Sequence, residues 1–146
     1  MTYRASIVIA TRNRCDTLQQ ALDSARRQTV PVELIVMDDG STDDTVEMVR
    51  HRFPDARLYQ LADRAGPCFQ RTEGARRAGS NYLFPIDDDS ILASPRTVEQ
   101  TLADFDHARI GAVAIPFINI VNEGRKARHI GTDPNATEIV EAFVGA

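Results

Sequence analysis

The sequence predicts an α/β domain in which a mostly parallel sheet carries helices on both faces, giving three layers. Short apolar runs alternate with helical patterns along most of the chain, which is typical of strand–helix–strand units. These runs are almost continuously apolar, as expected of strands that are covered on both faces. Three of them end in charged or amide side chains, and such sheets bind ligands beyond the carboxyl ends of their strands.

Five apolar runs are predicted to be strands. Each is bounded by charged or turn-forming residues, and the last is the longest. The predicted strands are residues 6–10, 32–37, 57–61, 82–86 and 110–120. Residues 122–137 are polar and turn-rich, which favours a mobile excursion such as a hairpin through Gly124. Residues 139–144 are expected to return as a final strand.

Two helices are expected between the first three strands. Asp16 would cap the first helix, which runs to about Gln28. Ser41 and Asp44 form a capping-box-like pair for the second helix, and Pro54 ends it. Both patterns show one apolar face, so these helices are predicted to pack on the sheet.

Two further helices carry proline and glycine signals. The third is predicted at residues 68–78, with Gly79 as its C-terminal cap. The fourth would begin with Ser94 as N-cap and Pro95 as the first helical residue. The helical residues expected in the core are Leu18, Ala21, Leu22, Ala25, Val46, Val49, Phe53, Val98, Leu102 and Phe105.

Composition limits the classes of function. A chain of 146 residues, 42% of them hydrophobic, is one domain by length and can bury a core. Its formal net charge of -4 argues against general binding to nucleic acid or anionic lipid. No apolar run approaches the ~20 residues of a membrane span, and no signal peptide precedes the first strand. Cys15 and Cys68 lack zinc or redox spacing, so we expect reduced thiols in a cytoplasmic protein.

The densest functional signal is the acidic triplet Asp87-Asp88-Asp89, directly after the fourth predicted strand. Three adjacent carboxylates repel one another and gain nothing from burial, so a cation among them explains them best. Mg²⁺ and Mn²⁺ prefer oxygen ligands and keep positions open for phosphate oxygens. Taken alone, the triplet is explained about equally well as a solvated acidic turn.

Two other strand ends favour the metal interpretation. The second predicted strand stops at Asp38 and Asp39, and the first stops at residues 11–14, which contain two arginines and an asparagine. Parallel strands would bring all three ends to one rim of the sheet. Carboxylates for a metal and arginines for phosphate, together on that rim, predict a nucleotide-diphosphate site.

In their order along the chain, these motifs resemble the nucleotide-binding half of a family-2-type GT-A glycosyltransferase. The matching residues are 6–14, 36–43, Gly66-Pro67, Arg71, Gly74, Ala78-Gly79 and Asp87-Asp88-Asp89. The resemblance covers about residues 5–120 and implies a GT-A, Rossmann-like fold. It also implies an inverting, metal-dependent transferase that takes a sugar from a nucleotide-diphosphate donor.

The resemblance further implies roles for individual residues. Asp39 would accept a hydrogen bond from a ring N–H of the nucleobase, which uracil offers, so a UDP-sugar is the favoured donor. Asp89, with Asp87, would bind Mg²⁺ or Mn²⁺ as part of the family's Asp-x-Asp motif. The expected nucleotide and donor contacts are Thr11, Arg12, Asn13, Arg14, Asp39, Arg71, Asp87 and Asp88. Arg12 departs from the family, which often has an aromatic residue there.

The resemblance divides the chain into a nucleotide-sugar-binding core, residues 1–121, and an incomplete acceptor-side region, residues 122–146. In this family a later segment supplies the carboxylate that deprotonates the acceptor hydroxyl, and no match to it occurs here. We therefore expect a truncated fragment whose catalytic base lies outside this chain and whose exposed face favours self-association. The sequence does not identify the acceptor, which could be a saccharide, a lipid or another molecule.

Two other interpretations stay open. A nucleotidyltransferase can share a similar sheet and metal–carboxylate chemistry. It would normally have a glycine-rich basic loop after the first strand, and residues 11–14 contain no glycine. The chain could also be a nucleotide-binding fragment without catalysis, and binding and turnover measurements separate these interpretations.

Overall fold

The computed structural model describes residues 2–61, 64–105, 109–115, 117–119 and 128–130, and every structural statement below concerns these residues. Contacts divide the chain into two compact units, Met1–Glu99 and Gln100–Ala146. The first unit contains the main sheet and every residue expected to contact the nucleotide or the metal. No helix in the described part of the chain is long and apolar enough to cross a bilayer.

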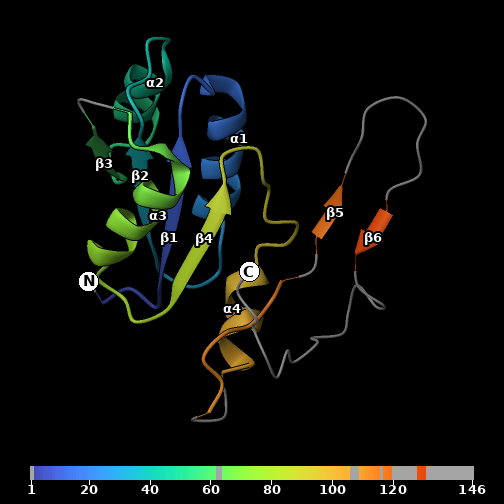
Figure 1. The fold of residues 1–146 in the computed structure, drawn as a ribbon. Helices are drawn as coiled ribbons and strands as arrows, with labels where there is room; N and C mark the ends of the chain where they lie inside the picture. The colour runs from blue at the N-terminus through green and yellow to red at the C-terminus, as the bar shows by residue number, and fades with distance from the viewer. Residues whose placement is uncertain (1, 62–63, 106–108, 116, 120–127, 131–146) are drawn as a thin grey trace. The chain divides into compact units, whose positions relative to one another are not determined.

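The centre of the first unit is a four-stranded parallel sheet (Figure 1). Its order is β3-β2-β1-β4, so β1 lies between β2 and β4. The strands are β1 (Ala5–Thr11), β2 (Val32–Asp38), β3 (Arg57–Gln60) and β4 (Leu83–Asp87). The four predicted parallel strands are therefore confirmed, each within one residue at either end.

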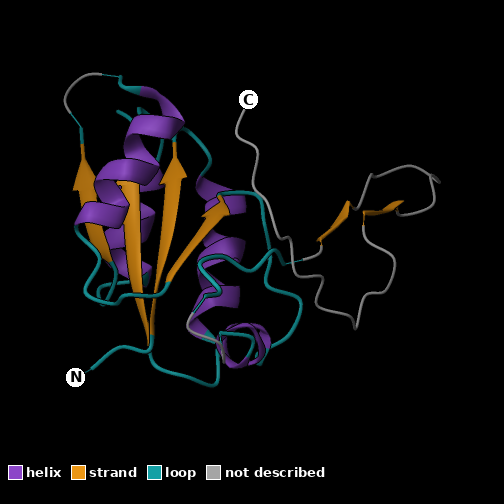
Figure 2. Cartoon of the chain, turned by 60° about the horizontal axis from the view of Figure 1, so that its bottom comes forward, coloured by secondary structure: helices purple, strands orange, loops and turns teal. Residues whose placement is uncertain are grey.

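Helices cover both faces of this sheet (Figure 2). The structure contains α1 (Cys15–Arg26), α2 (Thr45–Arg52), α3 (Gly66–Arg76) and α4 (Thr97–Ala103). In β1, Ile7 and Ile9 point to one face and Val8 to the other, and all three are buried. The face with Val8 packs against α3, while α1 contacts β2 and α2. The predicted three-layer arrangement is confirmed.

The predicted caps of the first two helices are wrong. The N-cap of α1 is Arg14, without a side-chain cap, and Asp16 lies in the first helical turn. Helix α2 begins only at Thr45, whose N–H donates to Asp43 Oδ1 at 3.1 Å. Ser41 does not cap it, because the Ser41 hydroxyl donates a short hydrogen bond to Asp38 instead. A partner three residues earlier in the same turn thus competes for the predicted capping group.

The later helix boundaries also differ from the prediction. Helix α3 ends at a C-cap formed by Arg77, and Gly79 lies beyond it, with its N–H donating to Glu33 Oε2 at 2.7 Å. Helix α4 begins at Thr97, so Ser94 and the following proline form a turn before the helix. The core positions expected on α1, α2 and α4 are buried or half-buried, as predicted.

Among its described residues, the second unit contains less strand than predicted. Residues 110–115 have no regular secondary structure, so the long strand over 110–120 is wrong. A short β5 (Phe117–Asn119) pairs antiparallel with β6 (Arg128–Ile130), on the two sides of the predicted hairpin turn. Gly124 itself and the final strand expected at 139–144 lie outside the described residues.

A buried carboxylate joins three strands and the α3–β4 loop near the amino end of the sheet. Glu33 of β2 is only 4% exposed and accepts hydrogen bonds from Ser6 Oγ at 2.6 Å, Gly79 N at 2.7 Å and Arg57 Nη1 at 2.5 Å. Burial raises the pKa of Glu33, but these hydrogen bonds outweigh burial, so the net shift is downward. Arg57 also lies over the ring of Tyr59, 5.5 Å from its centroid.

Replacing this carboxylate should change how stability responds to acid. A carboxyl with a lowered folded-state pKa stabilises the fold above its unfolded pKa, and this contribution is lost as the pH falls through the folded value. Glu33→Gln should lower stability at neutral pH and lose less stability between about pH 6 and pH 3. Urea denaturation across that range measures both, with exposed Glu47→Gln as the control. If the free energy of unfolding falls with pH by the same amount in Glu33→Gln and in the unmodified chain, the prediction is wrong.

Close contact between α3 and the sheet requires a glycine at position 74. A Cβ there would lie 2.4 Å from Val8 Cγ1 and 3.1 Å from Met37 Cγ. Gly74→Ala should destabilise the chain by about 1–3 kcal/mol through overpacking, more than alanine gains from its better helix propensity. Gly111→Ala is the control, because a Cβ at Gly111 meets nothing within 4 Å. Equal urea midpoints for the two variants would rule out the close contact.

Candidate functional site

The register of the sheet aligns three strand ends on one rim. Ala10 of β1 lies opposite both Met37 of β2 and Asp87 of β4, and Thr11 lies opposite Asp38. The residues that follow each strand therefore emerge side by side at the carboxyl end of the sheet. This rim brings together the polar side chains that the sequence singled out.

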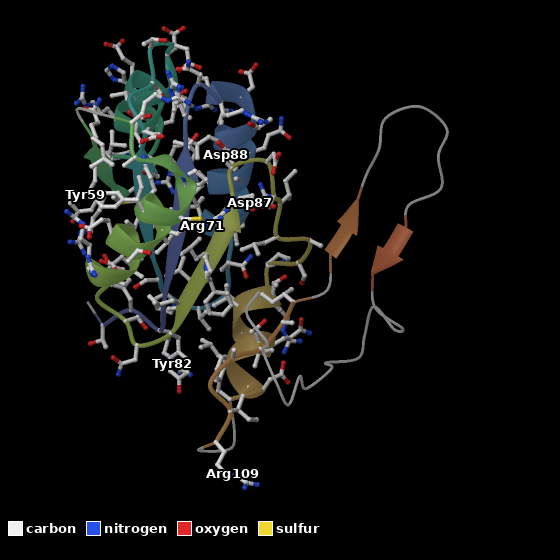
Figure 3. The ribbon with its side chains drawn as sticks, viewed as in Figure 1. Tyr59, Arg71, Tyr82, Asp87, Asp88 and Arg109 are labelled. Atoms are coloured by element: carbon white, nitrogen blue, oxygen red, sulfur yellow. The ribbon has the colours of Figure 1, made fainter. Side chains whose placement is uncertain are left out.

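Each carboxylate of the acidic triplet contacts a different part of the chain. Arg71 of α3 forms a short ion pair with Asp87 at the end of β4 (Figure 3). Thr11 Oγ1, at the end of β1, donates to Asp88 Oδ2 at 2.8 Å. Asp89 Oδ2 lies 3.7 Å from a guanidinium nitrogen of Arg14, in the loop after β1. The predicted carboxylate and arginine groups thus meet on the rim.

The chemistry of the acidic triplet suits a cation that binds carboxylates of the protein and oxygens of a ligand at the same time. No three His, Cys, Asp or Glu side chains in the described residues form a preformed metal cluster. Mg²⁺ commonly binds through one or two carboxylates and fills its other positions with water and phosphate oxygens. The side chains of Asp87 and Asp89 are 59% and 55% exposed, so their carboxylate oxygens are accessible to a cation from solvent.

Asp39 lies at the end of β2 and caps α3 from outside the helix. Its carboxylate accepts hydrogen bonds from Ala65 N at 2.8 Å and Gly66 N at 3.2 Å. The Ala65 N–H lowers the pKa of Asp39 most, burial opposes the shift, and Gln70, Gly66 and Arg64 lower it further. Asp39 is therefore ionised near neutral pH and keeps lone pairs for another donor.

Asn13 connects the loops after β1 and β2. Its N–H donates to Ser41 Oγ at 2.9 Å, and its Oδ1 accepts from Thr42 N at 2.7 Å. Its φ of 51° lies in the left-handed region, which asparagine tolerates better than most residues. Asn13, predicted to contact the nucleotide, thus also holds the loop that presents Arg14.

Two buried polar groups, one after β1 and one on α3, reach no hydrogen-bond partner among the described residues. Arg12 follows β1 and buries its Nε atom without a hydrogen bond within the described part of the chain. Gln70 of α3 is 0% exposed, and neither Nε2 nor Oε1 reaches hydrogen-bond geometry there. Sequence reasoning missed Gln70, although Gly74 one turn later marks the helix face against the sheet.

Asp38 is a second residue that sequence analysis left without a role. It is fully buried, and both oxygens accept from Ser41 N, at 3.3 and 3.1 Å. Asp38 therefore forms the turn after β2, whereas its neighbour Asp39 faces the start of α3. Cys15 and Cys68 are free thiols, as predicted.

This arrangement defines an α/β protein with carboxylates and arginines gathered on one rim of its sheet, and comparisons with known proteins assign its family. The model of glycosyl transferase family 2 matches residues 6–142. The chain belongs to that family.

Sequence relatives support the same assignment. The uncharacterized glycosyltransferase YibD of Escherichia coli is 30% identical over 119 residues, covering 76% of this chain and 34% of that protein. Validoxylamine A glucosyltransferase of Streptomyces hygroscopicus subsp. jinggangensis is 36% identical over 104 residues, covering 67% of this chain and 24% of that protein. The chain thus spans about a third or less of the length of these relatives.

Solved structures show the same GT-A fold. S. aureus TarS 1-349 in complex with UDP-GlcNAc superposes with a TM-score of 0.64 at 26% identity, covering 70% of this chain and 31% of that one. The mannosyltransferase PcManGT from Pyrobaculum calidifontis, solved with GDP-Man and Mn2+, superposes with a TM-score of 0.67 at 23% identity. The match covers 76% of this chain and 34% of that one. The predicted resemblance and fold class are confirmed.

Removing the Asp39 carboxylate should weaken the start of α3. Asp39→Ala leaves two helix-terminal N–H groups without an acceptor and should cost about 1 kcal/mol of stability. Asp39→Asn keeps an acceptor oxygen and should recover part of the loss. Urea denaturation with far-UV circular dichroism measures both variants. If the two substitutions are equally stable and match the unmodified chain, Asp39 does not cap the helix.

Proposed function

We propose that this chain is the donor-binding part of an inverting glycosyltransferase that uses a UDP-sugar and a divalent cation. One observation carries the proposal: Thr11, Arg14 and Arg71 each contact a different carboxylate of the acidic triplet. A rim with exposed carboxylates and guanidinium groups has the charges needed for a cation and for a diphosphate. Membership of glycosyl transferase family 2 supports a sugar nucleotide as the source of that diphosphate.

The state of Asp39 favours a uracil base. An ionised carboxylate only accepts hydrogen bonds, so it favours a ring that presents an N–H group. Uracil has such a donor between two carbonyl groups, whereas cytosine has an acceptor nitrogen at that position. The similarity to TarS, solved with UDP-GlcNAc, supports the same choice. We assign base recognition to Asp39, with Arg12 and Asn13 in the adjoining loop.

The acidic triplet and its partners would hold the rest of the donor. Asp89 and Asp87 are the proposed cation ligands, and Asp88 would face the ribose or the sugar beside Thr11. When bound, Mg²⁺ or Mn²⁺ would stabilise charge on the departing diphosphate. Arg71 and Arg14 lie on the same rim, and their planar guanidinium groups suit bidentate contact with phosphate oxygens.

The catalytic base of the transfer is not assigned to any residue of this chain. An inverting transfer needs a base within hydrogen-bond reach of the acceptor hydroxyl. We assign residues 1–121 to donor binding and residues 122–146 to the start of the acceptor-side region, with the base outside both. The family assignment favours this function over a nucleotidyltransferase.

Calorimetric titration with UDP, with and without Mn²⁺, tests the proposed function. The unmodified chain should bind UDP more tightly when Mn²⁺ is present. Asp89→Asn keeps the shape of the side chain but removes its charge, so metal-dependent UDP affinity should fall more than ~tenfold. The exposed Asp55→Asn is the control variant.

Three results would contradict parts of this assignment. Unchanged Mn²⁺ dependence in Asp89→Asn would exclude Asp89 as the principal metal ligand. No UDP binding by the unmodified chain would favour a purely structural fragment. Turnover of a nucleoside triphosphate would favour a nucleotidyltransferase.

A further inference from the structure

Gln70 is a fully buried side chain whose amide atoms reach hydrogen-bond geometry with no described residue. It is 0% exposed, and neither its Nε2 nor its Oε1 has a partner among the described residues. Burying an amide without a partner costs free energy, so most buried amides are paired. A functional role in another state of the protein would explain why an amide occupies this position.

The helix that carries Gln70 is held tightly against the sheet. Gln70 and Gly74, one turn apart, are the buried residues of α3. The backbone at Gly74 lies so close to β1 and β2 that a Cβ would clash with Val8. The close packing of α3 on the sheet therefore fixes the position of Gln70 and restricts where its amide can lie.

Gly66, whose N–H donates to Asp39 at 3.2 Å, lies one turn before Gln70 on α3, so both residues lie on the helix face near this carboxylate. Gln70 contributes to the lowered pKa of Asp39, although the two side chains do not reach hydrogen-bond geometry in this structure. On the other elements, Asp39 receives N–H groups from Ala65 and Gly66 and the positive charge of Arg64. Its neighbour Asp38 directs its own carboxylate to the turn after β2.

We propose that Gln70 is a positioning residue whose amide completes a hydrogen bond to Asp39 when nucleotide binds, orienting that carboxylate toward the base. The inference rests on the proposed function, in which Asp39 accepts a ring N–H. Gln70 keeps Asp39 as an acceptor and thereby favours uracil over cytosine. A protonated Asp39 would carry a donor O–H and would lose this preference.

The test compares Gln70→Leu, which removes the amide at similar volume, with Gln20→Leu, a control on the exposed face of α1. UDP-glucose is the probe because its diphosphate stays ionised across the titration. Gln70→Leu should weaken UDP-glucose on the order of tenfold at neutral pH. Its affinity should also fall at a higher pH on acidification, because Asp39 loses a group that lowers its pKa. Gln20→Leu should follow the unmodified chain.

A double-mutant cycle separates positioning from general loss of packing. In an Asp39→Asn background, Gln70→Leu should cause no further loss of affinity, because its effect acts through the carboxylate. If Gln70→Leu does not fold, Gln70→Glu keeps the shape and places a like charge beside Asp39. That variant should move the acid limb of binding to still higher pH.

The outcomes distinguish this inference from the proposed function. Normal UDP-glucose binding with identical pH profiles in the Gln70 variants and the unmodified chain overturns the role of Gln70 alone. Additive losses in the double-mutant cycle also overturn it. Absence of UDP-glucose binding by the unmodified chain refutes the proposed function and, with it, the inference.

Discussion

The parallel pairing of β1 with both of its neighbours is the constraint on which the rest of the structure depends. A slip of one residue would turn every side chain of β1 to the opposite face. Two contacts oppose such a slip: Ser6 donates to buried Glu33 of β2, and Val8 packs against Gly74 of α3. The same register puts Thr11 within hydrogen-bond distance of Asp88, so core packing and site geometry share one cause.

The negative charge of the acidic triplet is partly offset by side chains from other elements. A run of three aspartates would be self-repelling at the end of a strand. Arg71 from a helix and Arg14 from a loop provide positive charge close to it. Because these ion pairs are half-exposed, each contributes little to stability. In the proposed function, their positions therefore serve ligand binding more than the stability of the fold.

Sequence reasoning was most accurate where one local pattern decides the outcome. The apolar runs of β1, β2, β3 and β4 predicted strands close to their observed bounds, and the predicted site residues Asp87 and Arg71 meet on the rim. Helix caps were predicted less well, because other hydrogen-bond partners, near and distant in the sequence, compete for the capping groups. Ser41 binds Asp38, and the Gly79 N–H binds Glu33.

Other features left no local signal. A continuous apolar run does not distinguish a strand from irregular chain, which explains the error at 110–115. Gln70 escaped notice because a polar residue within a helix ordinarily faces water. Its burial depends on how closely α3 approaches the sheet, which is a property of the packed unit.

Asp39 accepts hydrogen bonds from the start of α3 and, in the proposed function, also binds the base. This combination limits how the site can evolve. The residue that we assign to the base also accepts the first N–H groups at the start of the helix that carries Arg71. Replacing it to accommodate another base would loosen that helix and disturb the arginine that we assign to the diphosphate. Changes of donor preference in descendants of this chain should therefore accumulate at neighbouring positions such as Arg12, while the aspartate persists.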